Sequence, residues 1–225
     1  MFSQKTIDFL FENKLQNSKI WYDDHKADFK EHVLTPLAEL VTKLAPTMLS
    51  IDDMLICDPK VDKTISRIYR DTRFSKDKSL YRDHMWCSFK RDKKIYTGFP
   101  EFFFDVSPAG FCYGFGYYAA GPDSMESMRA LILGDDKDFR KALKAIEKQN
   151  VFAMDGECYK RSKYPEKPTD LRNWLDRKSI YFIRNSEDFK TLYAENLTDI
   201  LAEDYKILEP VYKFLLKAEL RKHDK

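Results

Sequence analysis

The stretch Glu101–Ala119, E-F-F-F-D-V-S-P-A-G-F-C-Y-G-F-G-Y-Y-A, predicts the fold. Pro108 at the second position of a turn and Gly110 at the fourth are typical of a tight reversal of the chain, so the two arms are expected to pair as an antiparallel hairpin. If Ser107 pairs with Gly110, one face collects most of the large apolar side chains, because side chains alternate along a strand. That face, which we expect to be the core of a sheet, holds Phe102, Phe104, Val106, Phe111, Tyr113 and Phe115.

The opposite face of this hairpin places Gly114 and Gly116 across from Phe103 and Glu101. A glycine inside a strand is unfavourable by about 0.5–1 kcal/mol relative to alanine, so two on one face need a reason. One explanation is ordinary packing, with Phe103 covering Gly114. The other is a bare floor for a ligand or another chain segment, flanked by Glu101 and Asp105. We favour packing.

Outside the hairpin, hydrophobic periodicity and turn residues divide the chain into helices and further strands. Helices are expected over residues 4–15, 19 to about 44 with a break or kink near Pro36, 123–133, 136–148, 171–175, and from 186 nearly to the end. Strands are expected over residues 64–74, 84–90 and 179–183, with a second hairpin over 151–159 around Asp155-Gly156. The sequence therefore predicts an α+β fold over residues 1–225, a single domain with a mostly antiparallel sheet packed against N-terminal and C-terminal helices.

Composition excludes several classes of protein. The 225 residues are 43% hydrophobic and 15% aromatic, which is ample for a packed core. Four well-separated cysteines without a C-x-x-C pair are expected to be reduced thiols. No apolar run approaches the roughly 20 residues that span a bilayer, and the charged, amphipathic first helix is not a signal peptide, so we expect a cytoplasmic protein without a membrane partner. His25 and His32 are two helical turns apart beside lysines, and no metal site is predicted.

Positive charge is concentrated in one region. Residues 60–94 carry 12 Lys or Arg against 5 Asp or Glu, a net charge of +7, which leaves −5 for the remainder and a formal net charge of +2. The densest part is Arg67–Arg82, R-I-Y-R-D-T-R-F-S-K-D-K-S-L-Y-R. Neither alternating face of a strand over 64–74 is apolar, so some charge must lie near the core, which is costly unless it is paired or binds something. The concentration of positive charge in residues 60–94 favours a local anionic ligand over a generally basic surface.

The leading hypothesis is a small ligand that bears a phosphate or carboxylate, because guanidinium groups match such oxygens and aspartates orient the arginines. The candidate ligand-binding residues are Arg67, Arg70, Asp71, Arg73, Lys76, Asp77, Lys78, Tyr81 and Arg82.

Two alternatives remain open. In one, this stretch and residues 160–167 contact RNA or single-stranded DNA, with Tyr69, Tyr81 or Trp86 stacking on bases. In the other there is no ligand, and the arginines are neutralised by aspartates as a structural brace, with Glu101 and Asp105 as further partners.

No reaction can be assigned from these residues. The chain has no phosphate-cradling glycine loop, zinc-binding motif or nucleophile elbow, so no cofactor is predicted. If there is catalysis, Asp71, Asp77 or His84 would supply the acid or base. The oligomeric state is not predicted.

Several motifs make the chain resemble the family known as domain of unknown function 2461, found in bacteria and fungi. They are Asn17 with Trp21-Tyr22 and Lys26, the string Arg67–Lys78, and Gly114-Phe115-Gly116, with weaker similarity at 159–161 and 177–179. The resemblance spans nearly the whole chain, which implies one domain, but it implies no activity because the family has no established substrate. Leu80-Tyr81-Arg82 stands where the family usually has Pro-Tyr-Lys, so the rigid proline is lost here.

Overall fold

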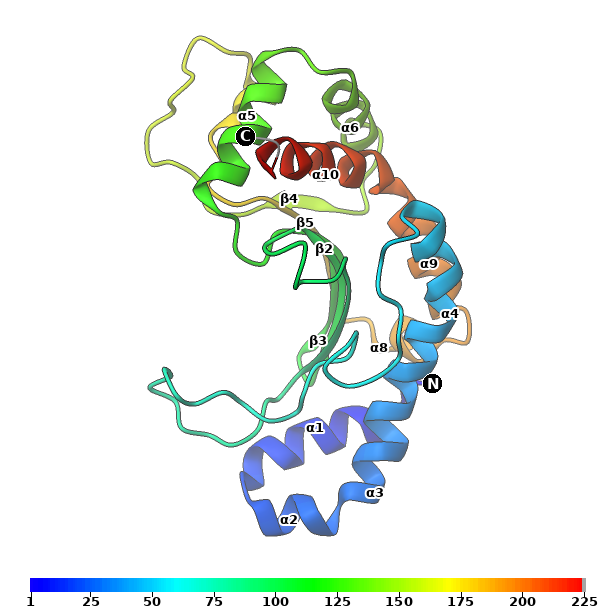
Figure 1. The fold of residues 1–225 in the computed structure, drawn as a ribbon. Helices are drawn as coiled ribbons and strands as arrows, with labels where there is room; N and C mark the ends of the chain where they lie inside the picture. The colour runs from blue at the N-terminus through cyan, green and yellow to red at the C-terminus, as the bar shows by residue number, and fades with distance from the viewer. Residues whose placement is uncertain (224–225) are drawn as a thin grey trace. The chain divides into compact units, whose positions relative to one another are not determined.

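The computed structural model describes residues 1–223 and has an α+β fold, as the sequence predicts (Figure 1). Five strands form one antiparallel sheet in the order β1-β2-β3-β5-β4. The strands are β1 (Met85–Phe89), β2 (Glu101–Ser107), β3 (Gly110–Gly116), β4 (Ala153–Asp155) and β5 (Tyr181–Ser186). Within residues 1–223, no helix combines the length and the apolar character that crossing a membrane requires.

The hairpin of β2 and β3 has the predicted buried face. Phe102, Phe104 and Val106 have no exposed surface, and the rings of Phe102 and Phe115 lie 4.6 Å apart between centroids. At the turn, Ser107 Oγ donates to the Gly110 carbonyl and accepts from the Ala109 N–H. The core face of the sheet therefore follows directly from the alternation of aromatic residues.

The strand glycines are explained by the backbone of β5. A β-carbon on Gly114 would lie 1.9 Å from the carbonyl oxygen of Phe182, and one on Gly116 would lie 2.4 Å from Cα of Tyr181. Side-chain atoms cannot approach backbone so closely, so only glycine fits. The glycines therefore make room for another chain segment, the backbone of β5. Cover of Gly114 by Phe103, the explanation favoured from the sequence, is not what requires glycine here.

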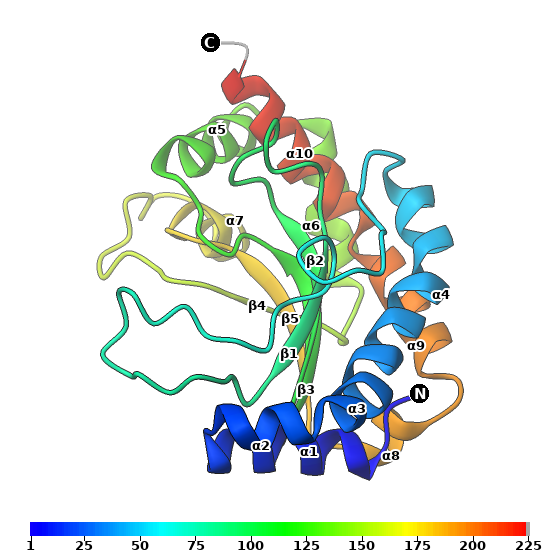
Figure 2. The same ribbon diagram turned by 60° about the horizontal axis from the view of Figure 1, so that its bottom comes forward.

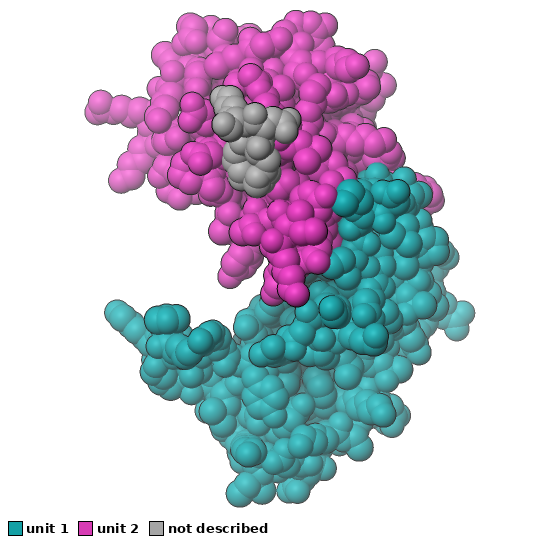
Figure 3. Space-filling view, viewed as in Figure 1, with its two compact units in different colours: residues 1–89, 103–113, 185–202 teal, residues 90–102, 114–184, 203–225 magenta. Residues whose placement is uncertain are grey.

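Two compact units are distinguished by the contacts within the chain (Figure 3). Unit 1 comprises residues 1–89, 103–113 and 185–202, and unit 2 comprises residues 90–102, 114–184 and 203 onward. The division passes through strands β2, β3 and β5. The single-domain assignment of residues 1–225 stays a prediction.

Unit 1 contains the N-terminal helices, which are more numerous and individually shorter than the sequence predicts, together with one helix from later in the chain. They are α1 (Gln4–Gln16), α2 (Lys19–Asp24), α3 (Lys26–Phe29), the π-helical turn η1 (Lys30–Leu34), α4 (Thr35–Ile51) and, later in the chain, α8 (Phe189–Tyr193). α1 packs beside η1 and α2 (Figure 2). The helix predicted from 19 to about 44 is thus interrupted at His25, passes through a π-helical turn just before Pro36, and continues through Pro46 to Ile51.

The π-helical turn before Pro36 has a local cause. Proline has no N–H, so it cannot donate to the carbonyl of His32 four residues earlier as a regular α-helix requires. The hydroxyl of Thr6, a buried residue of α1, donates to that carbonyl at 2.6 Å instead. A side chain of α1 therefore completes the hydrogen bonding of the interrupted helix.

Unit 2 contains α5 (Pro122–Leu133), α6 (Lys137–Glu147), α7 (Thr169–Leu175) and α10 (Glu209–His223). α9 spans Leu197–Ile207. Asp136 caps α6 by accepting from the N–H groups of Asp138 and Phe139, and Lys217 of α10 pairs with Asp136 at 2.6 Å. α6 and α10 are thereby joined both by packing and by charge.

The predicted hairpin over 151–159 is wrong, because β4 pairs with β5 in antiparallel register, with Ala153 opposite Ile183. The guanidinium of Arg177 donates to the carbonyl of Gly156 at 2.7 Å and to that of Met154 at 3.3 Å. These carbonyls are therefore satisfied by a distant side chain and not by the far arm of a hairpin.

The predicted strand over 64–74 is also wrong as a regular strand. Ile65 bridges Cys87 and Tyr69 bridges Tyr81 as isolated pairs. Pairing ends where Arg70 N donates to the carbonyl of Leu80 at 2.9 Å. Beyond that point aspartates accept from backbone two residues on: Asp71 from Arg73 N, and Asp77 from Ser79 N. Such local bonds compete with sheet pairing, so residues 71–79 form a loop.

Candidate functional site

Arg67 and Arg73 are neutralised at the surface. Arg67 Nε donates to Asp62, which raises the pKa of Arg67. Arg73 donates through Nε at 3.0 Å and Nη2 at 2.7 Å to Asp71, and these hydrogen bonds lower the pKa of Asp71 to about 2. All four side chains are more than half exposed. The two pairs shape the loop and leave neither guanidinium without a counter-charge.

Arg70 and Asp77 form a brace between the loop and α1. Arg70 Nη2 lies 3.2 Å from Asp77 Oδ2 and 3.4 Å from Ser75 Oγ. Lys14 of α1 donates to Ser79 Oγ at 3.1 Å and lies 3.8 Å from Asp77. Bonds from the Ser79 backbone and side chain lower the pKa of Asp77, with smaller contributions from the two cations. Asp77 is therefore an ionised anchor between two cations.

Lys76, Lys78 and Tyr81 have three different environments. Lys76 is exposed, and Lys78 Nζ donates to the carbonyl of Thr72 at 2.8 Å. Tyr81 has no exposed surface, and its ring lies 5.0 Å from that of Tyr22. Burial, aided by Tyr69, raises the pKa of Tyr81 to about 12. The structure thus places Tyr81 in the core of unit 1, where no ligand can stack on it.

Arg82 differs from the other arginines of the stretch. Its side chain is half-buried, its Nε donates to the carbonyl of Tyr69 at 3.3 Å, and its guanidinium carbon lies 4.6 Å from the ring centroid of Trp86. Among the described residues no carboxylate lies within ion-pair distance of Arg82, although its charge contributes to the lowered pKa of Asp71. These two contacts position the Arg82 guanidinium, and its terminal nitrogens, Nη1 and Nη2, have no hydrogen-bond acceptor in the described part of unit 1.

His84 and Asp105 form a pair that the sequence did not predict, since Asp105 was considered there as a partner of the arginines. His84 Nδ1 lies 2.6 Å from Asp105 Oδ2, and the His84 ring stacks on Trp86 with centroids 5.3 Å apart. Asp105 is therefore occupied by a histidine and not by an arginine of the stretch. Glu101 likewise pairs with Lys90, at 2.7 Å. The open possibility that Glu101 and Asp105 neutralise the arginines is therefore not what the structure has, because each pairs with another residue.

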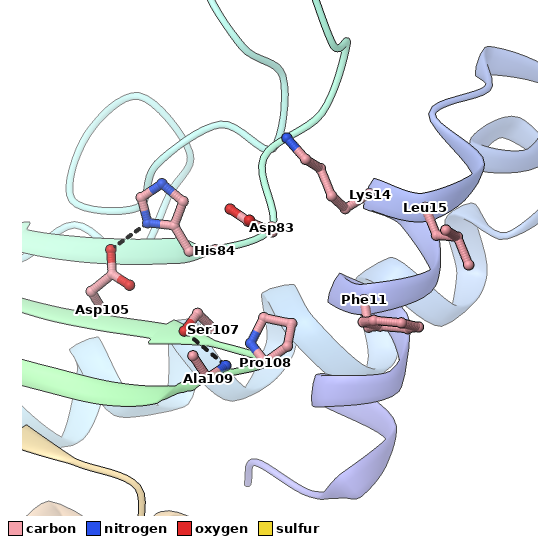
Figure 4. A pocket seen from close by; sticks show the side chains of 9 residues that line it. All are labelled: Phe11, Lys14, Leu15, Asp83, His84, Asp105, Ser107, Pro108 and Ala109. Atoms are coloured by element: carbon pink, nitrogen blue, oxygen red, sulfur yellow. Dashed lines mark hydrogen bonds and ion pairs between the residues drawn. The ribbon is translucent and has the colours of Figure 1, made fainter. Parts of the chain in front are cut away.

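A cavity of about 520 Å³ lies beside this pair, entirely within unit 1. Figure 4 shows Asp105 at one nitrogen of His84 while the other nitrogen points away from it, and Lys14 reaching from α1 toward the segment that carries Asp83. The residues lining the cavity are Phe11, Lys14, Leu15, Asp83, His84, Asp105, Ser107, Pro108 and Ala109.

Arg82, His84 and Trp86 share one side of the segment because they alternate along it. Trp86 contacts both of the others, so these three side chains form a continuous row that starts at the cavity lining with His84 and extends to Arg82. This alternation was visible in the sequence. The contributions of Lys14 and Asp105 were not, since both come from distant parts of the chain.

The charges of this region nearly cancel. Lys14, Arg70 and Arg82 face the three carboxylates Asp77, Asp83 and Asp105 when His84 is neutral. A single anionic group could pair with Arg82.

Other reactive groups near the cavity are quiescent. Cys112 lies near Asp105, and burial together with the charge of Asp105 raises the pKa of this thiol to about 12, which disfavours a thiolate nucleophile. Within residues 1–223 no group of three or more His, Cys, Asp or Glu side chains is arranged to hold a metal ion.

Comparison with protein families identifies the family of the chain. The family described as "Conserved hypothetical protein (DUF2461)" matches residues 5–214, nearly the whole chain, and the chain belongs to this family. The resemblance seen in the Arg67–Lys78 string is thereby confirmed. No curated protein matches the chain.

Proposed function

We propose that this member of the DUF2461 family binds a small ligand that carries one phosphate or carboxylate group, at the row formed by Arg82, Trp86 and His84 and in the adjoining cavity. The observation that carries the proposal is the state of Arg82. Its guanidinium is half-buried, fixed by the Tyr69 carbonyl and the Trp86 ring, and has no carboxylate partner within ion-pair distance in the described chain. A cation that is positioned but not neutralised is suited to bind an anion from outside.

The remaining candidate residues support this site without contacting the ligand. Arg67 and Arg73 stabilise the loop through their aspartates, and Arg70 with Asp77 holds it against α1. In this proposal these residues act as the structural brace that was the ligand-free alternative from the sequence. The proposal narrows the binding role to Arg82, with Lys14 and His84 facing the cavity and the exposed Lys76 and Lys78 outside it.

A second candidate is binding of single-stranded nucleic acid, and one observation favours it. Phe74 is 95% exposed at the loop, with Arg73 5.9 Å from its ring centroid. An exposed aromatic ring beside a cation can stack on a base. Binding that depends on Phe74 and weakens steeply with salt would support this alternative over the small ligand.

The test is thermal unfolding against a panel of phosphosugars, mononucleotides and organic acids. A ligand at 100 times its Kd stabilises the folded protein by about 2.7 kcal/mol. We expect at least one monoanionic compound to raise the Tm, Arg82→Gln to abolish the rise, and the matched control Arg73→Gln to retain it. A panel without any stabiliser, or equal loss in both variants, would contradict the proposal.

The proposal includes a cytoplasmic location. All four cysteines, including the half-exposed Cys57 and the exposed Cys158, are free. Free thiols persist in reducing compartments, which supports this location.

A further inference from the structure

We infer that His84 and Asp105 form a proton-transfer centre, with Nε2 of His84 as the general base and Asp105 as the positioning residue. The inference goes beyond ligand binding, because it assigns an activity to the cavity. It rests on the proposed function only for the class of substrate, an organic acid or phosphate ester with an acidic C–H or O–H bond.

The geometry of the pair fixes which nitrogen is the base. An ionised carboxylate accepts hydrogen bonds but donates none, so the contact of 2.6 Å requires the proton on Nδ1 of a neutral His84. Nε2 then carries the lone pair. Figure 4 shows that this second nitrogen points away from Asp105, so the lone pair is not occupied by the carboxylate.

Exposure and packing suit the same role. The Asp105 side chain is 24% exposed and that of His84 is 36% exposed, so the carboxylate is the more sheltered and the imidazole remains accessible. Trp86 stacks on the imidazole and fixes its plane. An orienting carboxylate and a fixed ring are the two requirements for a positioned histidine base.

The charged groups that line the cavity with His84 come from three segments of the chain. Asp105 approaches from β2, Asp83 is the neighbour of His84 in the chain, and Lys14 comes from α1. Arg82 lies over the Trp86 ring, which also stacks on His84, and the charge of Asp105 acts on the Cys112 thiol of β3. Lys14 can stabilise the negative charge that remains on the substrate.

The proton-transfer step balances without a further reactant. The substrate C–H or O–H bond breaks, its proton passes to Nε2, and the electron pair stays on the substrate. Asp105 keeps its hydrogen bond to the Nδ1 proton and stabilises the imidazolium. The proton returns to a different atom of the substrate, which neutralises the substrate anion and regenerates neutral His84.

A neutral probe tests this step apart from anion binding. With 5-nitrobenzisoxazole, a base removes the C–H proton, the electron pair forms a nitrile, and the N–O bond breaks to give a coloured phenolate. We expect the whole protein to accelerate this elimination over buffer, and His84→Gln to lower the rate by about 100-fold, the lower end of general-base effects. Asp105→Asn should lower it by a smaller factor.

The control is His25→Gln, a second histidine whose Nδ1 contacts the Trp21 carbonyl, outside the cavity lining. Its rate should equal that of the unaltered protein, and the rate should rise with pH in step with the titration of His84 followed by NMR. Equal rates in His84→Gln and the unaltered protein, or a pH profile that does not follow His84, would overturn the inference. If no anionic compound raised the Tm but the protein accelerated the elimination through His84, only the proposed function would be refuted. If an anionic compound raised the Tm through Arg82 but the elimination was not accelerated, only this inference would be refuted.

Discussion

Gly114→Ala provides a quantitative test of the close approach between β3 and β5. The added β-carbon would lie 1.9 Å from the Phe182 carbonyl oxygen and 2.9 Å from its carbon, whereas ordinary contact begins at 3.4 Å. Because both atoms belong to backbone, no side chain can rotate away to make room. One strand must shift, and its ladder hydrogen bonds weaken. We expect a loss of about 3 kcal/mol, the upper part of the range for overpacked sites.

The assay is urea unfolding followed by circular dichroism, with Gly121→Ala as the matched control. A β-carbon at Gly121 meets only Ser124 Oγ, at 3.6 Å. The gain from a less flexible unfolded chain and the loss of a glycine N-cap roughly cancel, so its stability should change by less than about 0.5 kcal/mol. If Gly114→Ala were as mild as the control, the close approach would not be what requires glycine. A Phe103→Ala variant more damaging than Gly114→Ala would restore the packing explanation.

Two further predictions concern hydrogen bonds described above. Thr6→Val should cost about 1–3 kcal/mol in urea unfolding, because it leaves the part-buried His32 carbonyl without its donor. Thr42→Val should be nearly neutral, because the exposed Thr42 hydroxyl donates to the Ala38 carbonyl. Equal effects would contradict the role given to Thr6. The Asp71 carboxyl should titrate near pKa 2 by NMR, and Arg73→Gln should return it toward 3.8. Since the folded pKa is depressed, the stability from this pair is present above pH 3.8 and is lost as the pH falls toward 2; an unchanged titration would refute the pairing.

Sequence patterns predicted the structural features that depend on residues close together in the chain. The alternation of Phe102, Phe104 and Val106 determines the core face of the hairpin, and it holds in the structure. The hairpin predicted over 151–159 failed because Arg177, some 20 residues away, supplies the hydrogen bonds. The regular strand over 64–74 failed because Asp71 and Asp77 bind their own backbone.

The candidate site was predictable in part for the same reason. The sequence identified Arg82 within the basic stretch and His84 as a candidate base. It could not show that Asp105 pairs with His84, or that Lys14 reaches the same cavity, because both contacts join distant positions. Nor could residue type alone separate the paired Arg67 and Arg73 from Arg82, since pairing depends on distances and not on composition.

The replacement of proline by Leu80 has a consequence for how relatives of this protein should be compared. Leu80 donates its N–H to Asn17 Oδ1 at 2.7 Å, a bond that joins the left-handed C-cap of α1 to the segment leading into Arg82. A relative with proline at this position has no such donor and must fix that segment through the stiffness of the ring. The two residues are thus alternative means of restraint, and in this chain the restraint depends on the Asn17 side chain. Reading either position alone would hide that dependence.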